Sequence, residues 1–494
     1  MSVVIWKEFN NSFQIIVMRK TIQQIKRLFT ILSALLSFWF AAFIQIRGKS
    51  ESDDKKRAIL LRQYIERLGS VFVKFGQFLS IHPTFLPPLY CAELFYLLEN
   101  VPAFSSDKVI QIFKKEFNQT PDELFQFFAI QPVAAASFGQ VHEAILKTGE
   151  KVAVKVQRPH IDKTVAEDVM LMRLLASILD ILPLGPNKFI DLVSEFELWT
   201  KEELDYLAEA QLTEEYANSV KTKRGKHIFA PKVYKKYSTK RIVTTEFIDG
   251  VTISKILLAI RNNDKPFLKE LKSIGFSRKE VALQIVNESL KQIYLQGFFH
   301  GDPHPANIIF TKNAQLAYID FGICGRLTRS ERITALRYSR CYWIQDWENA
   351  FEAIAQLCDT SKVKDMQKFK KEFIELFSTK ANQHQIRRGY NQFRGSALIQ
   401  DMLYMLQKNK AVLSPNTLLY FRTTLILRNI SFFLYPEMEA DEIIQGLKNI
   451  SLLNLVSELP KLFSKENRMK HLAKLINFFE KEIIKNSTNE TLRT

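Results

Sequence analysis

Three short motifs that combine a lysine, two aspartates and an asparagine restrict the folds open to this chain. They are Val152–Lys155 (VAVK), His300–Asn307 (HGDPHPAN) and Asp320–Gly322 (DFG). Each motif alone is weak, because an amphipathic strand edge or chance can produce it. Their combination in this order and spacing is a strong signal. The fold must therefore bring segments that are far apart in sequence to a single cleft.

The side chains of the three motifs are those that phosphoryl transfer from ATP requires. Lys155 would hold the α- and β-phosphates, and Asp302 would orient the acceptor. Asn307 and Asp320 would bind Mg²⁺, which prefers hard oxygen ligands. The expected cofactors are therefore ATP and Mg²⁺, and the expected class is an ATP-dependent enzyme.

Two histidines in the second motif have the spacing of a helical metal pair. His300 and His304 are four residues apart, but Pro303 and Pro305 make a regular helix there unfavourable. We therefore expect these histidines to order the backbone.

The lysine needs an acidic partner, and the segment 201–211 (KEELDYLAEAQ) is the candidate. On one continuous helix, Asp205 and Glu209 share a face while Glu203 points elsewhere. We predict that Glu209 pairs with Lys155. A solvated acidic helix face is the alternative.

A loop that would cover the nucleotide departs from the glycine-rich pattern of most kinases. Alanines stand at 134 and 136 where glycines are usual, and Gly139 and Val141 follow. Alanine resists positive φ, so the loop should be stiffer. The predicted nucleotide-binding residues are Ala134, Ala135, Ala136, Ser137, Gly139, Val141 and Lys155, with Glu246 and Ile248 at the end of a strand-like run.

The segment Leu28–Ile46 is strongly apolar and has no charge. As a helix it would be about 28 Å long, barely the thickness of a bilayer core. A span would carry the preceding basic residues Arg19, Lys20, Lys26 and Arg27 across the membrane, against the positive-inside tendency. A helix lying in the membrane plane avoids this cost. A buried core helix remains the alternative.

The formal charge of +17 suits nucleic acid, anionic membranes or phosphorylated ligands. The basic residues are scattered and form no continuous stripe interleaved with aromatics, so we expect no nucleic acid partner. The expected surface partner is anionic lipid. The four cysteines form no C-x-x-C pair and are expected to be free thiols.

The chain divides into five parts by composition and periodicity. A basic segment with the apolar membrane-associated helix (28–46) covers 1–57, ending in a solvated linker at 47–57. A helical extension at 58–130 and a small lobe with inserted helices at 131–250 follow. A helical lobe at 251–480 and a polar tail at 481–494 complete the chain.

The motifs together resemble the UbiB/ADCK family of atypical protein-kinase-like proteins. The matching segments are Lys74–Gln77 (KFGQ), Pro132–Val141 (PVAAASFGQV), Val152–Pro159 (VAVKVQRP), Glu203–Tyr206 with Glu209-Ala210, Asp302–Asn307 and Asp320–Gly322. The match covers roughly 58–326, and the K-x-G-Q motif joined to the alanine-rich loop is highly specific to this family.

The resemblance implies an α+β, two-lobed protein-kinase-like fold with a helical K-x-G-Q extension and a largely helical C-terminal lobe. The extension would carry Lys74, Gly76 and Gln77 over the active site, in place of a protein substrate, with Lys74 meeting Glu203 and Asp205. It implies an ATPase or kinase that supports isoprenoid quinone biosynthesis. Expected partners are the membrane and quinone-biosynthesis enzymes or quinone precursors. The kinase-like domain would lie on the cytoplasmic side, most naturally at a bacterial inner membrane.

Two rival functions stay open at this stage. Phosphotransferases of the aminoglycoside- or choline-kinase type share H-G-D-x-x-x-x-N but lack the K-x-G-Q motif and the alanine-rich loop. A nucleotide-binding scaffold without turnover would keep the same pocket.

Overall fold

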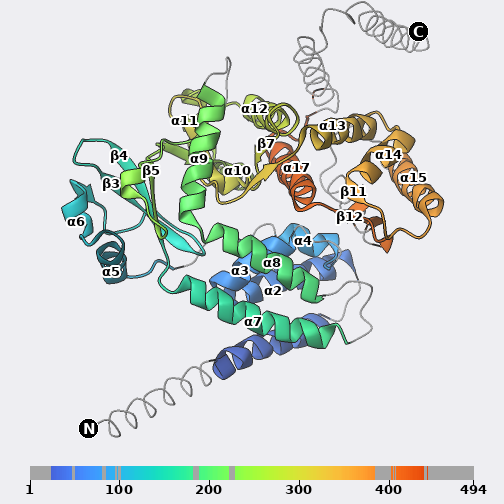
Figure 1. The fold of residues 1–494 in the computed structure, drawn as a ribbon, viewed down its shortest axis with the longest axis horizontal. Helices are drawn as coiled ribbons and strands as arrows, with labels where there is room; N and C mark the ends of the chain where they lie inside the picture. The colour runs from blue at the N-terminus through green and yellow to red at the C-terminus, as the bar shows by residue number, and fades with distance from the viewer. Residues whose placement is uncertain are drawn as a thin grey trace, which may run out of the picture.

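The computed structural model describes residues 24–46, 50–80, 85–94, 97, 102–181, 189–221, 228–383, 442 and, except for 404 and 407, 402–438. Its architecture is α+β with two lobes, as predicted (Figure 1). The predicted tail 481–494 and the end of the predicted C-terminal lobe lie outside the described residues.

The small lobe is built on an antiparallel sheet in the order β1-β3-β4-β5, with β2 paired to β3. The strands are β1 Phe127–Phe128, β2 Ala134–Ala135, β3 Gly139–Ile145, β4 Lys151–Gln157 and β5 Ile242–Glu246. Strand β4 alternates buried valines with more exposed residues, as a half-buried strand requires. Gly149, at φ 97°, supplies the left-handed turn that closes the β3–β4 hairpin.

Helices α5 (Ser106–Phe117) and α6 (Pro121–Leu124) precede this sheet. Val109, Ile112 and Phe113 of α5 share one core cluster with the valines of β4. The predicted boundary at 130 is therefore too late, because the apolar face of α5 is buried on the small-lobe sheet rather than on the extension.

Three helices are inserted between β4 and β5: α7 (Ile161–Leu179), α8 (Phe189–Glu203) and α9 (Tyr206–Lys221). Figure 1 shows α7 and α8 side by side, with the helices of the extension beside them, and α9 running up towards the larger lobe. These inserted helices thus connect the extension to both lobes.

The extension contains helix Gln24–Ala42, the π-helical turn η1 (Phe40–Gln45), α2 (Glu51–Leu68), α3 (Ser70–Leu79) and α4 (Pro88–Leu94). Helix α3 is buried in a cluster with residues of α7 and α8. By length and composition, Gln24–Ala42 is the one helix in the described residues that could cross a membrane.

The prediction of a solvated linker at 47–57 is wrong for its second half. Ser50 and Asp53 form a capping box that starts α2 at Glu51, and Arg57 is buried. The charged residues that suggested a linker are the first turns of a helix, where acidic side chains favour the N-terminus.

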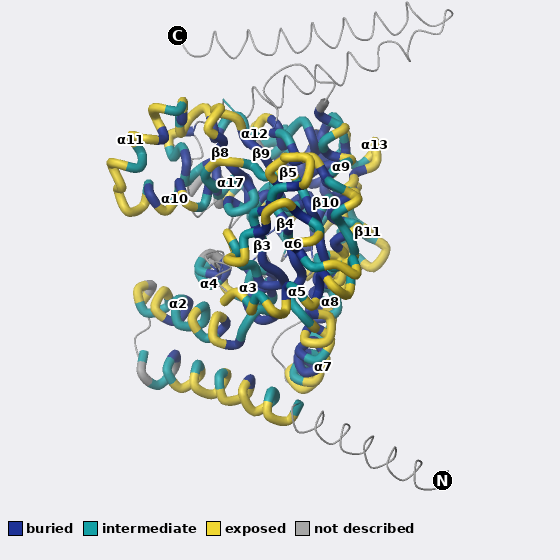
Figure 2. The backbone as a smooth tube through the Cα atoms, turned by 90° about the vertical axis from the view of Figure 1, so that its left-hand side faces the viewer, coloured by how far each residue is buried: buried dark blue, intermediate teal, exposed yellow. Residues whose placement is uncertain are grey.

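The link Phe247–Asp249 leads from β5 to β6 (Gly250–Thr252), which opens the larger lobe. This lobe holds the sheet β6-β8-β9, the pairs β7-β10 and β11-β12, and a helical core. Helix α17 (Pro415–Leu434) passes through this core, and Figure 2 marks much of it as buried. The short helix η2 (Lys235–Tyr237) precedes β5, and its Tyr237 packs against the core of the small lobe. The other elements of the larger lobe are α10 (Ile253–Arg261), α11 (Lys265–Ser273), α12 (Arg278–Lys291), η3 (Gln292–Gln296), β7 (Phe298–His300), η4 (Pro305–Asn307), β8 (Ile308–Thr311), β9 (Leu316–Tyr318), β10 (Cys324–Arg326), α13 (Arg329–Trp343), α14 (Trp347–Gln356), β11 (Cys358–Asp359), α15 (Met366–Gln383) and β12 (Val412–Leu413).

Candidate active site

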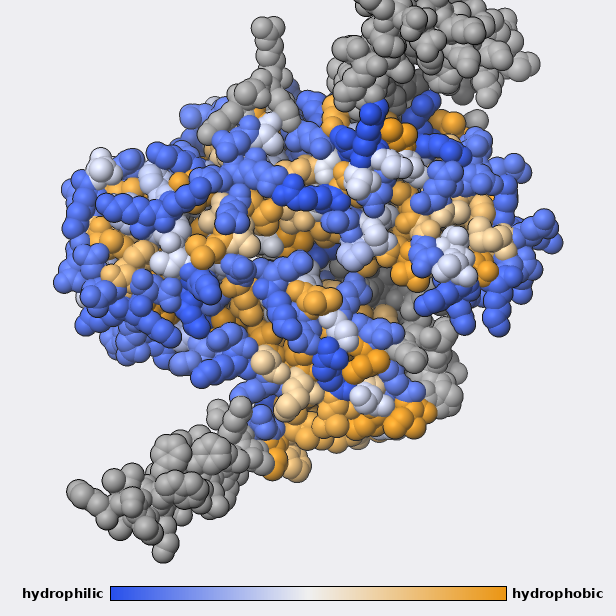
Figure 3. Space-filling view, in the orientation of Figure 1, coloured by the Kyte–Doolittle hydropathy of each residue, from blue (hydrophilic) through white to orange (hydrophobic). Residues whose placement is uncertain are grey.

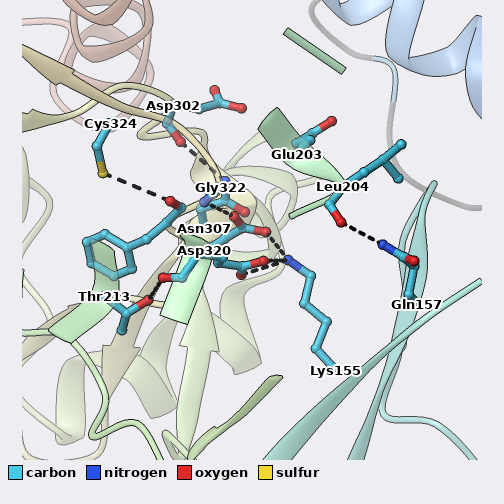
Figure 4. A network of polar contacts seen from close by, with 12 residues as sticks. Lys155, Gln157, Glu203, Leu204, Thr213, Asp302, Asn307, Asp320, Gly322 and Cys324 are labelled. Carbon is cyan, nitrogen blue, oxygen red and sulfur yellow. Dashed lines mark hydrogen bonds and ion pairs between the residues drawn. The ribbon is translucent and has the colours of Figure 1, made fainter. Parts of the chain in front are cut away.

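Lys155 lies at the centre of a group of charged side chains between the lobes (Figure 4). Its Nζ atom is 2.8 Å from Oε1 of Glu209 on α9 and 2.9 Å from Oδ2 of Asp320. Side chains of β4 alternate between the two faces of the sheet, and Lys155 is on the face where Glu209 and Asp320 lie. The predicted pairing of Lys155 with Glu209 is therefore present, and the same ammonium group also binds the aspartate of the third motif.

Two carboxylates share this one ammonium group, and their pKa values move apart. Burial raises the pKa of Glu209 to about 7, against the attraction of Lys155. Burial also disfavours the charged form of Asp320, but Lys155 and the Gly322 amide outweigh it and lower the pKa of Asp320. The pKa of Lys155 is raised because the two acids outweigh its burial. Lys155 is therefore charged and Asp320 is ionised. Of the three groups, Glu209 is the one that a proton binds most easily near neutral pH.

The histidines of the second motif order the backbone, as predicted. The buried His300 ring is 2.5 Å from the carbonyl oxygen of Asp320, so the second motif is fixed to the third. Burial lowers the pKa of His300 and keeps its ring neutral. His304 caps the 3₁₀ turn η4 by accepting from the Ala306 amide.

Asp302 and Asn307 lie on the same loop, next to Asp320. The Asn307 side-chain amide donates to the carbonyl oxygen of Asp302 at 3.2 Å, which leaves its Oδ1 atom as the ligand it can offer a metal. Burial disfavours the charge on Asp302, but the nearby charges of Arg422, His304 and Lys74 lower its pKa. Asp302 is therefore an ionised carboxylate close to the predicted metal ligands.

Arg422 is a site residue that the sequence reasoning missed. Its Nη2 atom is 3.4 Å from Oδ2 of Asp302, and its guanidinium lies 4.9 Å from the centre of the Trp199 ring. It comes from α17, far along the chain from every motif. The available signal was an arginine in a largely apolar helix, which also carries Arg428, since a buried charge needs a partner.

The residues present fit a magnesium-bound nucleotide better than a metal held by protein alone. Among the described residues, no three His, Cys, Asp or Glu side chains cluster so as to hold a metal ion. Asn307 and Asp320 supply two hard oxygen ligands, and Mg²⁺ typically takes one or two protein ligands with phosphate oxygens and water. The donor set therefore matches Mg²⁺ that arrives with a phosphate ligand.

The alanine-rich loop lies in the same sheet as the strand that carries Lys155. Ala134 of β2 pairs with Val141 of β3, and Val141 lies opposite Lys155 in β4. The Ala136 amide donates to the carbonyl oxygen of Gly139 at 2.8 Å and closes the turn. The loop and the lysine are thus at matching positions of neighbouring strands, with β3 between them.

Two features of this loop bear on ligand binding. A Cβ atom at Gly139 would lie 2.5 Å from the Tyr206 hydroxyl and 2.7 Å from the Val156 carbonyl, so the position has room only for glycine. The Ser137 hydroxyl is buried and has no hydrogen-bond partner within the described residues. A buried hydroxyl without a partner is costly, and a phosphate oxygen is a group that could satisfy it.

The other two predicted nucleotide-binding residues lie at the connection between the lobes. Glu246 ends β5 and Ile248 lies in the link to β6. The Lys232 amide donates to the Glu246 carboxylate at 3.2 Å. Both residues are in the segment that passes from one lobe to the other, at the edge of the site and not among the charged side chains.

The extension reaches the site through Lys74. This buried lysine forms an ion pair with Glu203 at the end of α8, and its Nζ atom lies 5.5 Å from the Trp199 ring and 5.8 Å from the Phe138 ring. Gln77 instead donates to the carbonyl oxygen of Leu97 at 3.1 Å and so holds the extension together. Of the two polar K-x-G-Q residues, Lys74 is the one that contacts the site.

The prediction that Asp205 joins the Lys74 contact is wrong. The chain breaks between α8 and α9, and the Asp205 carboxylate accepts hydrogen bonds from the Leu207 and Ala208 amides, which caps α9. Aspartate favours this position because it binds the unpaired amides of a first helical turn. The break also turns Glu203 towards Lys74, which a single continuous helix would not allow.

Gly76 has a packing role in α3. A Cβ atom there would lie 2.9 Å from Ile65 Cγ2 and would also meet the Leu97 side chain. Glycine therefore allows α3 to approach α2 closely.

The four cysteines are free thiols, as predicted.

Comparison with known proteins agrees with this geometry. The ABC1 atypical kinase-like domain model matches residues 96–354, just over half of the chain. The uncharacterized protein slr0889 of Synechocystis is 35% identical over 276 residues, covering 54% of this chain and 65% of that protein. The chloroplastic protein ACTIVITY OF BC1 COMPLEX KINASE 7 of Arabidopsis thaliana is 30% identical, covering 79% of this chain and 54% of that protein.

These matches span about half to two thirds of the relatives' own lengths. A solved structure titled as the Rv3197–erythromycin complex from Mycobacterium tuberculosis has a TM-score of 0.45 at 20% identity, and it covers 74% of this chain and 91% of that one. At this TM-score it adds nothing to the assignment, which rests on the family match and on the residues above. The family match covers the small lobe, the paired lysine and the loop of Asp302 and Asn307, and this chain belongs to the ABC1 (aarF/UbiB) family of atypical kinase-like proteins.

Proposed function

We propose that this chain binds Mg-ATP and acts as an ATPase or phosphotransferase at a membrane surface, where it supports the biosynthesis of an isoprenoid quinone such as ubiquinone. The observation that carries the catalytic part is the contact of one ammonium group, that of Lys155, with both Glu209 and Asp320. In kinase-like sites the lysine–glutamate pair and the metal-binding aspartate must be in place together.

Each site residue has a role in this proposal. Lys155 holds the α- and β-phosphates, and Glu209 orients Lys155 from α9. Asn307 and Asp320 hold Mg²⁺, and Asp302 positions the attacking oxygen and receives its proton. The magnesium-bound nucleotide supplies the transferable phosphoryl group and a positive charge that offsets the acidic residues. The Ala134–Val141 loop covers the phosphates.

The extension favours a small acceptor or water over a protein acceptor. Lys74 lies close enough to influence the charges of both Asp302 and Asp320. Its ion pair with Glu203 holds α3 beside the side of the site where an acceptor would enter. A folded protein substrate would have to displace this helix, whereas water or a small hydroxyl compound would not.

The quinone and membrane parts rest on the family and on the N-terminal helix. UbiB-type proteins act in quinone biosynthesis at membranes, so we propose quinone precursors or quinone-biosynthesis enzymes as partners. Helix Gln24–Ala42 is apolar enough to interact with lipid. We propose the cytoplasmic face of a bacterial inner membrane as the location.

The test is Mg²⁺-dependent ATP hydrolysis by the purified full chain, with and without anionic vesicles and a quinone-like phenol. We expect hydrolysis that these additions stimulate and that Asp320→Asn abolishes. Asp249→Asn is the matched control, because this exposed aspartate only pairs with Lys312 at 2.7 Å. Unchanged hydrolysis by Asp320→Asn would remove its role as a metal ligand.

The same assay separates the alternatives. Nucleotide binding without hydrolysis under every condition would favour a scaffold. Phosphorylation of choline or an aminoglycoside in place of hydrolysis would favour a small-molecule phosphotransferase. Quinone profiles of a knockout strain test the biosynthetic role, which fails if the quinone content does not change.

A further inference from the structure

Helix Gln24–Ala42 is largely apolar, but the described protein covers only one side of it. Ile31 is 1% exposed and packs, with Leu28 and Ala34, against the cluster of α3, α7 and α8. Exposed apolar side chains line the rest of the helix: Ile25, Phe29, Leu32, Leu35, Leu36, Trp39 and Phe40. A helix that is apolar all round is normally enclosed by protein or by lipid. The exposed side therefore calls for an apolar environment.

Helix α7 continues this apolar surface. Most of its exposed apolar residues fall on one stripe with helical spacing: Met170, Leu174, Ile178 and, just after the helix, Ile181. The two helices are joined by Arg27, which donates to both carboxylate oxygens of Asp168 at 2.8 Å. Figure 3 shows hydrophobic surface along the lower edge of the molecule, where α7 and the helix beside it lie. One surface thus combines two helices.

Both ends of helix Gln24–Ala42 are tied to the same body. At its start, Arg27 also donates to the carbonyl oxygen of Leu68 at 2.8 Å. At its end, the buried Arg57 donates to the carbonyl oxygens of Ala42 and Ile46 at 2.8 and 2.7 Å. A helix about 28 Å long that is fixed at both ends cannot place those ends on opposite sides of a bilayer. Its axis must lie along the membrane surface.

Two of the polar side chains on the exposed side, Thr30 and Ser33, are already satisfied by the helix itself. The Thr30 hydroxyl donates to the carbonyl oxygen of Lys26 at 3.0 Å, and the Ser33 hydroxyl donates to that of Thr30 at 3.0 Å. Hydroxyls in lipid need such local partners, because no water is available there. This side can therefore enter an apolar medium without leaving these donors unpaired.

Positive charge accompanies the apolar surface. A groove of about 620 Å³ between the helix and α2 is lined by Leu36, Trp39 and Phe40 on one wall and by Tyr64 and Arg67 on the other. Arg67 is exposed and lies 5.3 Å from the Tyr64 ring, and within the described residues it forms no ion pair. A guanidinium beside an apolar groove suits a lipid phosphate above its acyl chains.

We propose that helix Gln24–Ala42 and α7 insert side by side into one leaflet of an anionic bilayer, with the helix axis in the membrane plane and Arg67 at the headgroup phosphates. The occupant of the surface is phospholipid. This inference deepens the membrane part of the proposed function and rests on that part alone, so catalytic activity does not enter it.

The first experiment is flotation of the full chain with phosphatidylcholine vesicles and with vesicles that also contain phosphatidylglycerol. We expect stronger binding to the anionic vesicles and about tenfold or greater weakening in Phe29→Ser/Leu36→Ser, because two large apolar side chains leave the lipid. The matched control is Leu258→Ser/Ile333→Ser, exposed apolar residues on the larger lobe, which should bind as the parent does. Arg67→Gln should reduce the preference for anionic vesicles.

Two results of this experiment overturn the proposal. The first is that the parent chain binds neither kind of vesicle, and the second is that the Phe29/Leu36 variant binds as tightly as the parent chain. ATP hydrolysis measured on the same samples separates failure of the membrane surface from failure of the catalytic proposal. A third result would also overturn the proposal: the parent chain forms dimers and does not bind vesicles, and the Phe29/Leu36 variant is monomeric. The surface would then bind a second copy of the chain.

The second experiment tests the in-plane orientation in spheroplasts that express the chain. Cysteines in place of Ser2 and of the exposed Lys269 are treated with a membrane-impermeant maleimide, with the parent chain as background. We expect both positions to react only after lysis. Reaction of one position in intact spheroplasts would show that the helix spans the membrane.

Discussion

The Lys74–Glu203 ion pair joins the extension to the end of α8, and the cost of breaking it can be estimated. The two side chains are only 8% and 15% exposed, and removing one partner of a buried pair costs about 3–5 kcal/mol. The contacts of Lys74 with the Trp199 and Phe138 rings remain and offset about 0.5–2 kcal/mol of this cost. We therefore expect Glu203→Gln to lose about 2–3 kcal/mol.

The measurement is a double-mutant cycle with Lys74→Met, Glu203→Gln and the double variant. Because the pair ties α3 to the body, the readout is native-state hydrogen exchange of the amides in Ser70–Leu79, without nucleotide. The double variant buries neither charge, so we expect a coupling energy of about 2 kcal/mol. The control pair Lys151–Glu143, at 47% and 29% exposed and followed in the amides of β3 and β4, should show a coupling below about 1 kcal/mol.

The reasoning fails if the two substitutions are additive within about 0.5 kcal/mol. Additivity would mean that Lys74 and Glu203 are each satisfied by other groups. The extension would then be held by its apolar packing on α7 and α8 alone.

Three further predictions follow from single residues. Arg422→Gln removes the positive charge that lowers the pKa of Asp302 most and should raise that pKa, moving the acid limb of the hydrolysis profile to higher pH; an unmoved limb contradicts this electrostatic role. Gly76→Ala should lower the free energy of unfolding by about 1–3 kcal/mol through overpacking between α2 and α3, measured in urea. Burial lowers the pKa of His142, so the stability its neutral ring contributes is present above pH 6.5 and is lost as pH falls through its folded-state pKa. Replacing His142 with asparagine should remove an acid-side slope of up to about 1.4 kcal/mol per pH unit, seen in urea titrations from pH 7 to 4.

The convergence of Lys155, Asp302, Asn307 and Asp320 could be predicted because short motifs encode it locally. A hairpin fixes the face on which Lys155 points, and the prolines near Asp302 stop a helix from forming there. Each motif carries its own geometry over a few residues. Only the convergence of the three motifs at one site had to be inferred, and it was inferred from the chemistry that their side chains share.

Features that depend on where a helix stops were harder to predict. A continuous helix over 201–211 placed Glu203 away from the site, whereas the break before Tyr206 turns it towards Lys74 and makes Asp205 a cap. Aspartate before an apolar residue was a possible capping signal, but it competed with an uninterrupted acidic pattern. The outcome depended on α3 packing beneath α8, which is a tertiary effect.

Arg422 was beyond local reasoning for a different reason. Its partners, Asp302 and Trp199, come from two other parts of the chain, and no spacing rule links the three. The boundary at 130 failed in the same way, because α5 has an apolar face that suits either neighbour. Periodicity shows that a face must be buried, but it does not say against what.

The two aspartates between the lobes, Asp302 and Asp320, are each paired with a base, and acids and bases nearly balance around them. Apart from the histidines and Tyr206, the charged groups of the site in the described structure are Lys74, Lys155 and Arg422 on one side, and Glu203, Glu209, Asp302 and Asp320 on the other. With every group charged, the acids exceed the bases by one. Burial, with the nearby charge of Asp320 adding to it, raises the pKa of Glu209 to about 7, and a proton there cancels the excess. A bound Mg²⁺ would offset the excess at Asp320 instead, so the side chains proposed as metal ligands belong to a site whose charge favours a cation.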